Sequence, residues 1–298
     1  HVLKVMASIT LGVPEQKLRV IAPAVGGGFG CKLNVYAEEI LCMALAQRHR
    51  VPVRWTESRS EAAVATIQGR AQRQTIELAA DADGKLTVVR ATILADMGAY
   101  LQLVAPGVPL LGAFLYHGLY DVPLYSFTCK SVFTNLTPTD AYRGAGRPEA
   151  TYAIERAMDS LALAVGVGPD EIRSRNFIPT EKFPYDSPAG LVFDSGNYQP
   201  ALDRAKELIG WDERLAEQAD RRASGSTTHL GIGISTYVEM CGLAPSRTLA
   251  ALNYGAGGWE SATVRILPTC KVQVVTGATP HGRGLETFWS MTFADRQA

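Results

Sequence analysis

One stretch decides how this chain folds: Val25-Gly26-Gly27-Gly28-Phe29-Gly30-Cys31-Lys32. It stands between an apolar run at residues 18–21, which we predict to be a short strand, and a predicted helix at residues 37–50. Four glycines in five positions let the backbone approach a ligand and expose amides to an anion at the helix start. The G-x-G-x-x-G dinucleotide template does not fit, because Cys31 and Leu33 occupy the places of its last glycine. A glycine-rich turn without a ligand is the alternative.

Two further loops have the same character. The second loop reads Thr137-Pro138-Thr139-Asp140-Ala141-Tyr142-Arg143-Gly144-Ala145-Gly146-Arg147, and Pro148 opens a predicted helix that runs to about residue 165. Its two arginines, beside the free amides of a helix start, could form an anion clamp, or they could be surface arginines of a solvated loop. The third loop reads Thr276-Gly277-Ala278-Thr279-Pro280-His281-Gly282-Arg283-Gly284-Leu285-Glu286-Thr287. It again leads from a predicted strand into a predicted helix, although a lone histidine in a turn is more often structural.

The composition of the chain argues against several classes of protein. The 298 residues contain 29 Lys and Arg against 29 Asp and Glu, so the formal net charge is zero. A nucleic-acid-binding protein needs a basic surface, and we therefore expect no nucleic-acid partner. Five cysteines without a C-x-x-C pair indicate neither a disulfide framework nor a zinc site, which favours a reducing, cytoplasmic location. Residue 1 is His rather than Met, and we expect the chain to be an interior piece of a longer protein.

An uncharged stretch at residues 97–120 raises the question of a membrane span. Two prolines, Pro106 and Pro109, and four glycines make a continuous lipid-facing helix a poor interpretation. We predict instead a buried, partly irregular segment that lines a cavity, and no membrane span.

The remaining patterns predict an α+β fold rather than a doubly wound sheet. Strands are predicted at residues 72–80 and 85–94, joined by an Asp83-Gly84 turn, and at residues 127–133, 230–237, 261–267 and 271–276. Helices are predicted at residues 199–209 and 212–223. The linker-like Ser224-Gly225-Ser226 marks the predicted domain boundary.

Three glycine loops that each offer amides or a cation suggest a large anionic cofactor held from several sides. The motifs G-G-G-F-G-C-K, A-Y-R-G-A-G-R and H-G-R-G-L-E-T occur in this order at residues 26–32, 141–147 and 281–287. In this combination the chain resembles the molybdenum-cofactor-binding large subunit of the molybdenum hydroxylases, the family of xanthine dehydrogenase, aldehyde oxidase and the carbon monoxide dehydrogenase large chain. The resemblance covers essentially the whole chain and includes Gly242-Leu243-Ala244-Pro245-Ser246. It implies a first molybdenum-cofactor-binding domain at residues 1–224 and the start of a second at residues 225–298.

The resemblance also implies a function and a site. The parent protein would be an oxidoreductase that hydroxylates an electron-poor carbon, in an N-heterocycle or an aldehyde, with water as the oxygen source. Its cofactor would be molybdenum-molybdopterin in the cytosine dinucleotide form, with the metal held through the pterin dithiolene rather than by a protein ligand. The implied cofactor-binding residues are Gly27, Gly28, Phe29 and Gly30, then Arg143, Gly144, Ala145 and Gly146, then Gly282, Arg283 and Gly284. Phe29 would lie near the metal. The implied partners are an iron–sulfur small subunit with 2Fe-2S clusters and a medium subunit with FAD, in a dimer of heterotrimers.

Some residues depart from the pattern that the resemblance implies. Carbon monoxide dehydrogenases proper have a copper-binding cysteine where this chain has Gly144, so CO oxidation at a Mo–Cu site is not expected. Arg283 replaces the glutamine of a G-Q-G motif, and an arginine cannot accept a hydrogen bond. The family's catalytic glutamate is expected beyond residue 298, because neither Glu239 nor Glu286 aligns with it. The fragment alone would then be inactive. A non-catalytic cofactor-binding or interaction module is the alternative.

Overall fold

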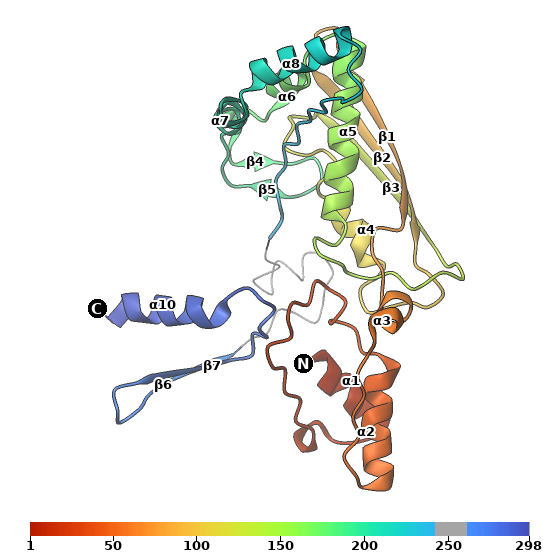
Figure 1. Cartoon of the computed structure of the whole chain (residues 1–298), viewed down its shortest axis with the longest axis vertical. Coiled ribbons are helices and arrows are strands. Elements are labelled where there is room, and N and C mark those ends of the chain that lie inside the picture. The colour runs from red at the N-terminus through yellow and green to blue at the C-terminus, as the bar shows by residue number, and fades with distance from the viewer. Residues whose placement is uncertain (242–260, 298) are drawn as a thin grey trace. The chain divides into compact units, whose positions relative to one another are not determined.

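The computed structural model describes residues 1–241 and 261–297 (Figure 1). Their contacts divide the chain into two units, one formed by His1–Ile67 with Met240–Ala298 and the other by Gln68–Glu239. The predicted domain boundary at residue 224 stays a prediction, and the Gly242–Ser246 motif lies outside the described residues.

The Gln68–Glu239 unit is built on a three-stranded sheet. Its strands are β1 (Gln72–Ala80), β2 (Leu86–Asp96) and β3 (Leu124–Val132), in the order β1-β2-β3. The β1–β2 pair is antiparallel and closes at the predicted Asp83-Gly84 turn, where Gly84 has a φ of 79°. The β2–β3 pair is parallel, with Thr92 opposite Thr128. A parallel neighbour requires a long crossover, and residues 97–123 supply it.

Helix α5 (Arg147–Val165) covers one face of this sheet, as Figure 1 shows. Alternate residues of β2, including Val89 and Ile93, are buried, and Ile154 and Met158 of α5 are buried with them. The helix begins with Pro148 in its first turn and ends at Gly166, whose φ of 81° is left-handed, as the sequence predicts. The other elements of the unit are α4 (Gly107–Gly112), α6 (Pro169–Asn176), α7 (Gln199–Ile209), α8 (Trp211–Ala223), the short strands β4 (Tyr185–Asp186) and β5 (Val192–Phe193), and the 3-10 turn Thr180–Lys182.

The uncharged stretch at residues 97–120 is largely irregular, as predicted, but it is buried only in part: residues 115–120 are buried, whereas Tyr100 and Leu101 are exposed. Its regular structure is limited to α4, and Leu115, Tyr116, His117 and Tyr120 are each no more than 3% exposed. Among the described residues, no helix has both the length and the apolar character that a membrane span requires.

The second unit combines helices from the beginning of the chain with a hairpin and a helix from its end. Its elements are α1 (Val2–Leu11), the 3-10 turn Glu15–Lys17, α2 (Ala37–His49), α3 (Arg59–Ala65), the antiparallel pair β6 (Ala262–Ile266) and β7 (Val272–Thr276), and α10 (Leu285–Gln297). The predicted strand at residues 18–21 is wrong, since these residues form no ladder. Helix α1 was not predicted.

Candidate cofactor-binding site

The first glycine loop follows a path that side chains rarely allow. Gly26, Gly27 and Gly30 have φ values of 69°, 101° and 106°, and even Phe29 has a φ of 52°. Gly27 and Gly28 are buried. A Cβ on Gly27 would lie 2.5 Å from Cε2 of Phe29, so the phenyl ring folds back over the glycine backbone. The ring is 52% exposed and could also contact a ligand.

Side chains just after this loop hold its carbonyl groups. The Cys31 thiol donates to Gly28 O at 3.2 Å, the Lys32 ammonium donates to Val25 O, and the Tyr36 hydroxyl donates to Cys31 O at 2.5 Å. Burial raises the pKa of Tyr36 to about 12, so this hydroxyl keeps its proton at physiological pH. The carbonyl groups of Val25, Gly28 and Cys31 are therefore bonded by the chain itself.

The third glycine loop lies beside the first. A Cβ on Gly28 would lie 3.7 Å from the His281 ring, and a Cβ on Gly282 would lie 3.9 Å from Gly27 N. The loop connects β7 to α10, as predicted, and Gly282 and Gly284 have φ values of 79° and 67°. Arg283 is exposed. Loops that are some 250 residues apart in the sequence thus form one glycine-lined surface in the His1–Ile67 and Met240–Ala298 unit.

The second glycine loop belongs to the other unit and has three consecutive left-handed residues. Gly144, Ala145 and Gly146 have φ values of 90°, 41° and 91°. The turn is closed by Ala145 N donating to Tyr142 O at 2.7 Å and by Arg147 N donating to Gly144 O at 3.2 Å. Successive left-handed backbone of this kind forms concavities that bind anions through N–H groups.

Neighbouring atoms leave no room for a side chain at two glycines of this second loop. A Cβ on Gly146 would lie 1.9 Å from Val108 O at the start of α4, and a Cβ on Gly144 would lie 2.4 Å from Cγ of Pro148. Helix α4 in turn approaches at Gly112, where a Cβ would lie 2.8 Å from Gly146 O. Glycine is thus required on both sides of this contact.

Arg147, one of the two arginines of the anion-clamp interpretation, is paired with an acid of the chain. Its Nε lies 2.6 Å from Oε1 of Glu239, and the Arg147 side chain is only 16% exposed, so its charge is already compensated. Glu286, the other acid near the motifs, is an exposed residue in the first turn of α10.

Sequence reasoning missed Arg70, whose guanidinium contacts the backbone of the second loop. The only local signal was the pair Gly69-Arg70 just before the predicted strand at residues 72–80. Among residues 1–241 and 261–297, no group of three or more His, Cys, Asp or Glu side chains is placed to hold a metal ion.

Two family models together match most of the chain. The description "Molybdopterin cofactor-binding domain" applies to two models, one that matches residues 1–177 and one that matches residues 204–296. The chain belongs to the molybdopterin cofactor-binding family. The resemblance to the molybdenum hydroxylases and the predicted α+β fold of aldehyde oxidase and xanthine dehydrogenase type are therefore confirmed.

Three similar proteins place this molybdopterin cofactor-binding chain among its relatives. It is 37% identical to the carbon monoxide dehydrogenase large chain of Afipia carboxidovorans, over 99% of this chain and 37% of the relative. It is 36% identical to the nicotine 6-hydroxylase large subunit of Paenarthrobacter nicotinovorans, over 99% of this chain and 36% of the relative. The crystal structure of quinoline 2-oxidoreductase from Pseudomonas putida 86 superimposes with a TM-score of 0.90 and 34% identity, over 96% of this chain and 36% of that chain.

These relatives bear on the expectation about CO oxidation. The expectation against CO oxidation is not borne out, because a carbon monoxide dehydrogenase large chain is among the relatives that match almost the whole of this chain. The molybdopterin cofactor-binding chain spans little more than a third of the length of the relatives that it matches. The assignment of the eleven site residues stays a prediction.

The contact between Gly146 and α4 predicts the effect of one added methyl group. We expect Gly146→Ala to destabilise the Gln68–Glu239 unit by about 2 kcal/mol more than Gly166→Ala, because the new Cβ would overlap Val108 O. Gly166 is the matched control, since it ends the same helix at a φ of 81° with nothing within 4 Å of its Cβ position. Urea denaturation followed by circular dichroism measures both variants, and equal losses would contradict the prediction.

Proposed function

We propose that this chain supplies much of the molybdopterin-binding surface of an oxidoreductase that hydroxylates an electron-poor carbon of an N-heterocycle or an aldehyde. The observation that carries the proposal is the meeting of Gly27 and Gly28 with His281 and Gly282, which places two glycine-rich segments side by side. When bound, the cofactor supplies a molybdenum centre that accepts two electrons from the substrate.

The chain's own residues bind and orient that cofactor. The amides of Gly27, Gly28 and Gly30 and those of Gly282 and Gly284 offer hydrogen bonds to the pterin and its phosphates. Arg283 is exposed and offers a cation to a phosphate, which suits the cytosine dinucleotide form of the cofactor. The exposed Phe29 side chain would pack beside the bound cofactor. In the Gln68–Glu239 unit, the second loop, from Arg143 to Gly146, offers amides other than that of Ala145, which donates to Tyr142 O.

The electrons leave through partners in this proposal. An iron–sulfur small subunit with 2Fe-2S clusters and a medium subunit with FAD would complete the complex, as a dimer of heterotrimers. Neither acid near the motifs is placed as a general base, since Glu239 is paired with Arg147 and Glu286 is exposed on α10. These 298 residues by themselves are therefore expected to bind cofactor without turning over substrate.

Oxidation of CO is a second candidate, favoured by the 37% identity to a carbon monoxide dehydrogenase large chain. Residue 144 offers no side-chain ligand to copper in this chain. The two candidates differ in substrate and in metal content, so one preparation can separate them.

The test uses the full-length protein purified with its partner subunits. We expect about one molybdenum and one pterin per large subunit, release of CMP on acid hydrolysis, and dye reduction by quinoline, nicotine or an aromatic aldehyde. CO-dependent dye reduction with stoichiometric copper would support the second candidate instead. A fully assembled complex without molybdenum and pterin would defeat both and leave the non-catalytic module.

A further inference from the structure

Arg70 contacts the second glycine loop at three places and helix α5 at Glu149. Its Nη1 donates to Tyr142 O at 3.4 Å, its Nη2 donates to Arg143 O, and its guanidinium carbon lies 5.8 Å from the centre of the Tyr142 ring. The same Nη1 lies 3.1 Å and 3.2 Å from the two carboxylate oxygens of Glu149. One side chain thus binds two successive carbonyl groups of the loop and the first turn of α5.

The backbone that holds Arg70 is itself built around this loop. Arg70 has a φ of 68°, and a Cβ on the preceding Gly69 would lie 2.7 Å from Cβ of Tyr142. Two backbone hydrogen bonds hold the neighbouring Gln68: Gln68 N donates to Pro138 O, and Gln68 O accepts from Asp140 N, both at 3.0 Å. A left-handed, non-glycine residue is uncommon and persists only where its surroundings hold it. The guanidinium is therefore fixed relative to the loop that it contacts.

The hydrogen bonds from Arg70 to the loop carbonyl groups determine where the loop amides point. In a trans peptide the carbonyl of one residue and the N–H of the next point in opposite directions. Because Arg70 binds the carbonyl groups of Tyr142 and Arg143, the N–H groups of Arg143 and Gly144 face away from Arg70. They are presented on the opposite side of the loop, together with the left-handed turn at Gly144 to Gly146.

The charge of Arg70 does not compete for the ligand of the loop. Glu149 is buried, with its side chain 6% exposed, and its carboxylate receives Nη1 of Arg70 through both oxygens. A guanidinium paired in this way is neutralised locally and serves as a fork of donors rather than as an anion-binding cation.

We propose that Arg70 is a positioning residue of the cofactor site: by holding the carbonyl groups of Tyr142 and Arg143, it turns the amides of Arg143 and Gly144 toward the cofactor. The identity of the ligand rests on the proposed function, whereas the order that Arg70 imposes on the loop does not. Arg70 acts through the loop and does not itself touch the cofactor.

The experiment compares three variants of the full-length protein purified with its partner subunits. Arg70→Lys keeps the charge opposite Glu149 but loses the fork that reaches two carbonyl groups, and Arg70→Met loses both. Arg90→Met is the matched control, because Arg90 pairs with Glu77 at 3.3 Å on the exposed face of the same sheet. The two readouts are the hydrogen exchange of the Ala145 and Arg147 amides, which close the loop, and the rate of pterin loss on dialysis.

We expect Arg70→Lys to accelerate exchange of these two amides about tenfold, as the loss of one charged hydrogen bond does, and to accelerate pterin loss by a similar factor. Arg70→Met would have a larger effect, and Arg90→Met none. If Arg70→Lys matches the wild type within twofold in either readout, the proposal is overturned. A wild-type complex that contains no pterin would defeat the proposed function, and amide exchange alone would then decide whether Arg70 holds the loop.

Discussion

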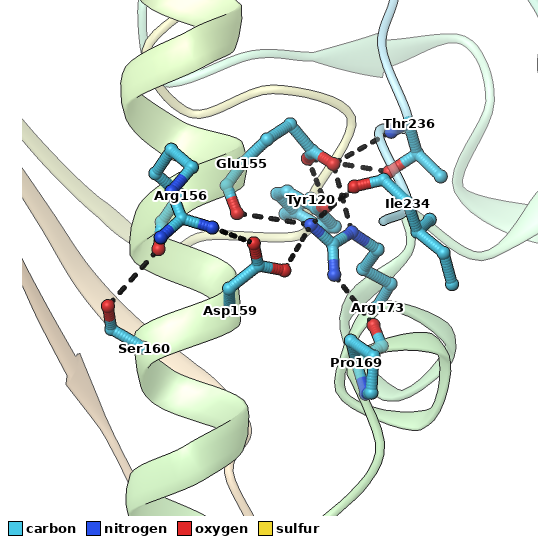
Figure 2. Close-up of polar contacts among 9 residues, drawn as sticks. All are labelled: Tyr120, Glu155, Arg156, Asp159, Ser160, Pro169, Arg173, Ile234 and Thr236. Atoms are coloured by element: carbon cyan, nitrogen blue, oxygen red, sulfur yellow. Dashed lines mark hydrogen bonds and ion pairs between the residues drawn. The ribbon is translucent and has the colours of Figure 1, made fainter. Parts of the chain in front are cut away.

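Replacing Arg173 by methionine is expected to lower the free energy of unfolding of the Gln68–Glu239 unit by about 3–5 kcal/mol. Arg173 lies at the centre of the network in Figure 2 and is fully buried. Its Nε donates to Oε2 of Glu155 at 2.9 Å, and its Nη2 lies 3.0 Å from Oδ1 of Asp159. Three backbone carbonyl groups, those of Glu155, Pro169 and Ile234, accept its remaining hydrogen bonds.

The loss is large because the variant leaves a buried carboxylate without a cation. Glu155 is 4% exposed, and it also accepts from Thr236 N at 2.7 Å and from the Tyr120 hydroxyl. Burial raises the pKa of Tyr120 well above its usual value, with the Glu155 charge acting in the same direction, so the phenol donates and cannot carry the negative charge. A methionine fills the volume of the arginine but offers no donor.

Hydrogen exchange of the slowest β2 amides measures this loss, since these amides report opening of the whole unit. Arg204→Met is the control, because Arg204 and Glu207 form an ion pair with side chains 60% and 69% exposed, and its removal should cost less than about 0.5 kcal/mol. The double variant Arg173→Met with Glu155→Leu should recover part of the loss, because it also removes the buried carboxylate that Arg173→Met leaves without a cation. A loss below about 1 kcal/mol for Arg173→Met alone would contradict the prediction.

Acid is expected to destabilise the same unit through His117. The imidazole is fully buried, lies 5.8 Å from the Tyr125 ring and 5.7 Å from the Phe193 ring, and neither ring nitrogen has a hydrogen-bond partner among the described residues. Burial lowers its pKa to about 4, and the nearby Phe114 backbone offsets this only in part. In the unfolded chain the pKa is about 6.5.

The direction in which stability changes with pH follows from the folded and unfolded pKa values of His117. A depressed pKa means that the unfolded chain binds the proton more readily, so the contribution of His117 is fully present above pH 6.5 and falls as the pH drops toward 4. A difference of about 2.5 pKa units corresponds to about 3 kcal/mol when the pH reaches 4 and below, and about 2 kcal/mol of this is lost by pH 5.

His117→Phe keeps an aromatic ring between Tyr125 and Phe193 and removes the titrating group. Urea denaturation at pH 7.5 and at pH 5 should show that the wild type loses about 2 kcal/mol more than this variant. His229→Gln, at an exposed position of the same unit, should follow the wild type. Parallel pH dependence of the wild type and His117→Phe would rule out His117 as the cause.

Much of the fold could be predicted from local patterns. Helix α5 follows from its apolar spacing, Pro148 in its first turn and Gly166 after its end, and the β1–β2 hairpin follows from alternation on either side of Asp83-Gly84. These signals depend on residues that are close in the chain, so the sequence displays them directly.

The wrong and missing predictions concern partners that are far apart in the chain. Residues 230–237 alternate like a strand but form none, because the groups that a ladder would use are bound by side chains: Thr236 N donates to Glu155 and Ile234 O accepts from Arg173. The parallel pairing of β2 with β3 has no local signal either, since the chirality and length of the crossover decide it.

The glycine-rich loops show the same difference between local signals and long-range contacts. The sequence by itself determined where the three glycine-rich loops lie, because glycine and its spacing are local properties, and the order of those motifs was enough to indicate the family. Only the tertiary structure decided that Gly28 lies beside His281, that Arg147 is neutralised by Glu239 and that Arg70 holds the second loop. Each of these contacts joins residues more than 70 positions apart, and only the folded path of the chain brings such residues together.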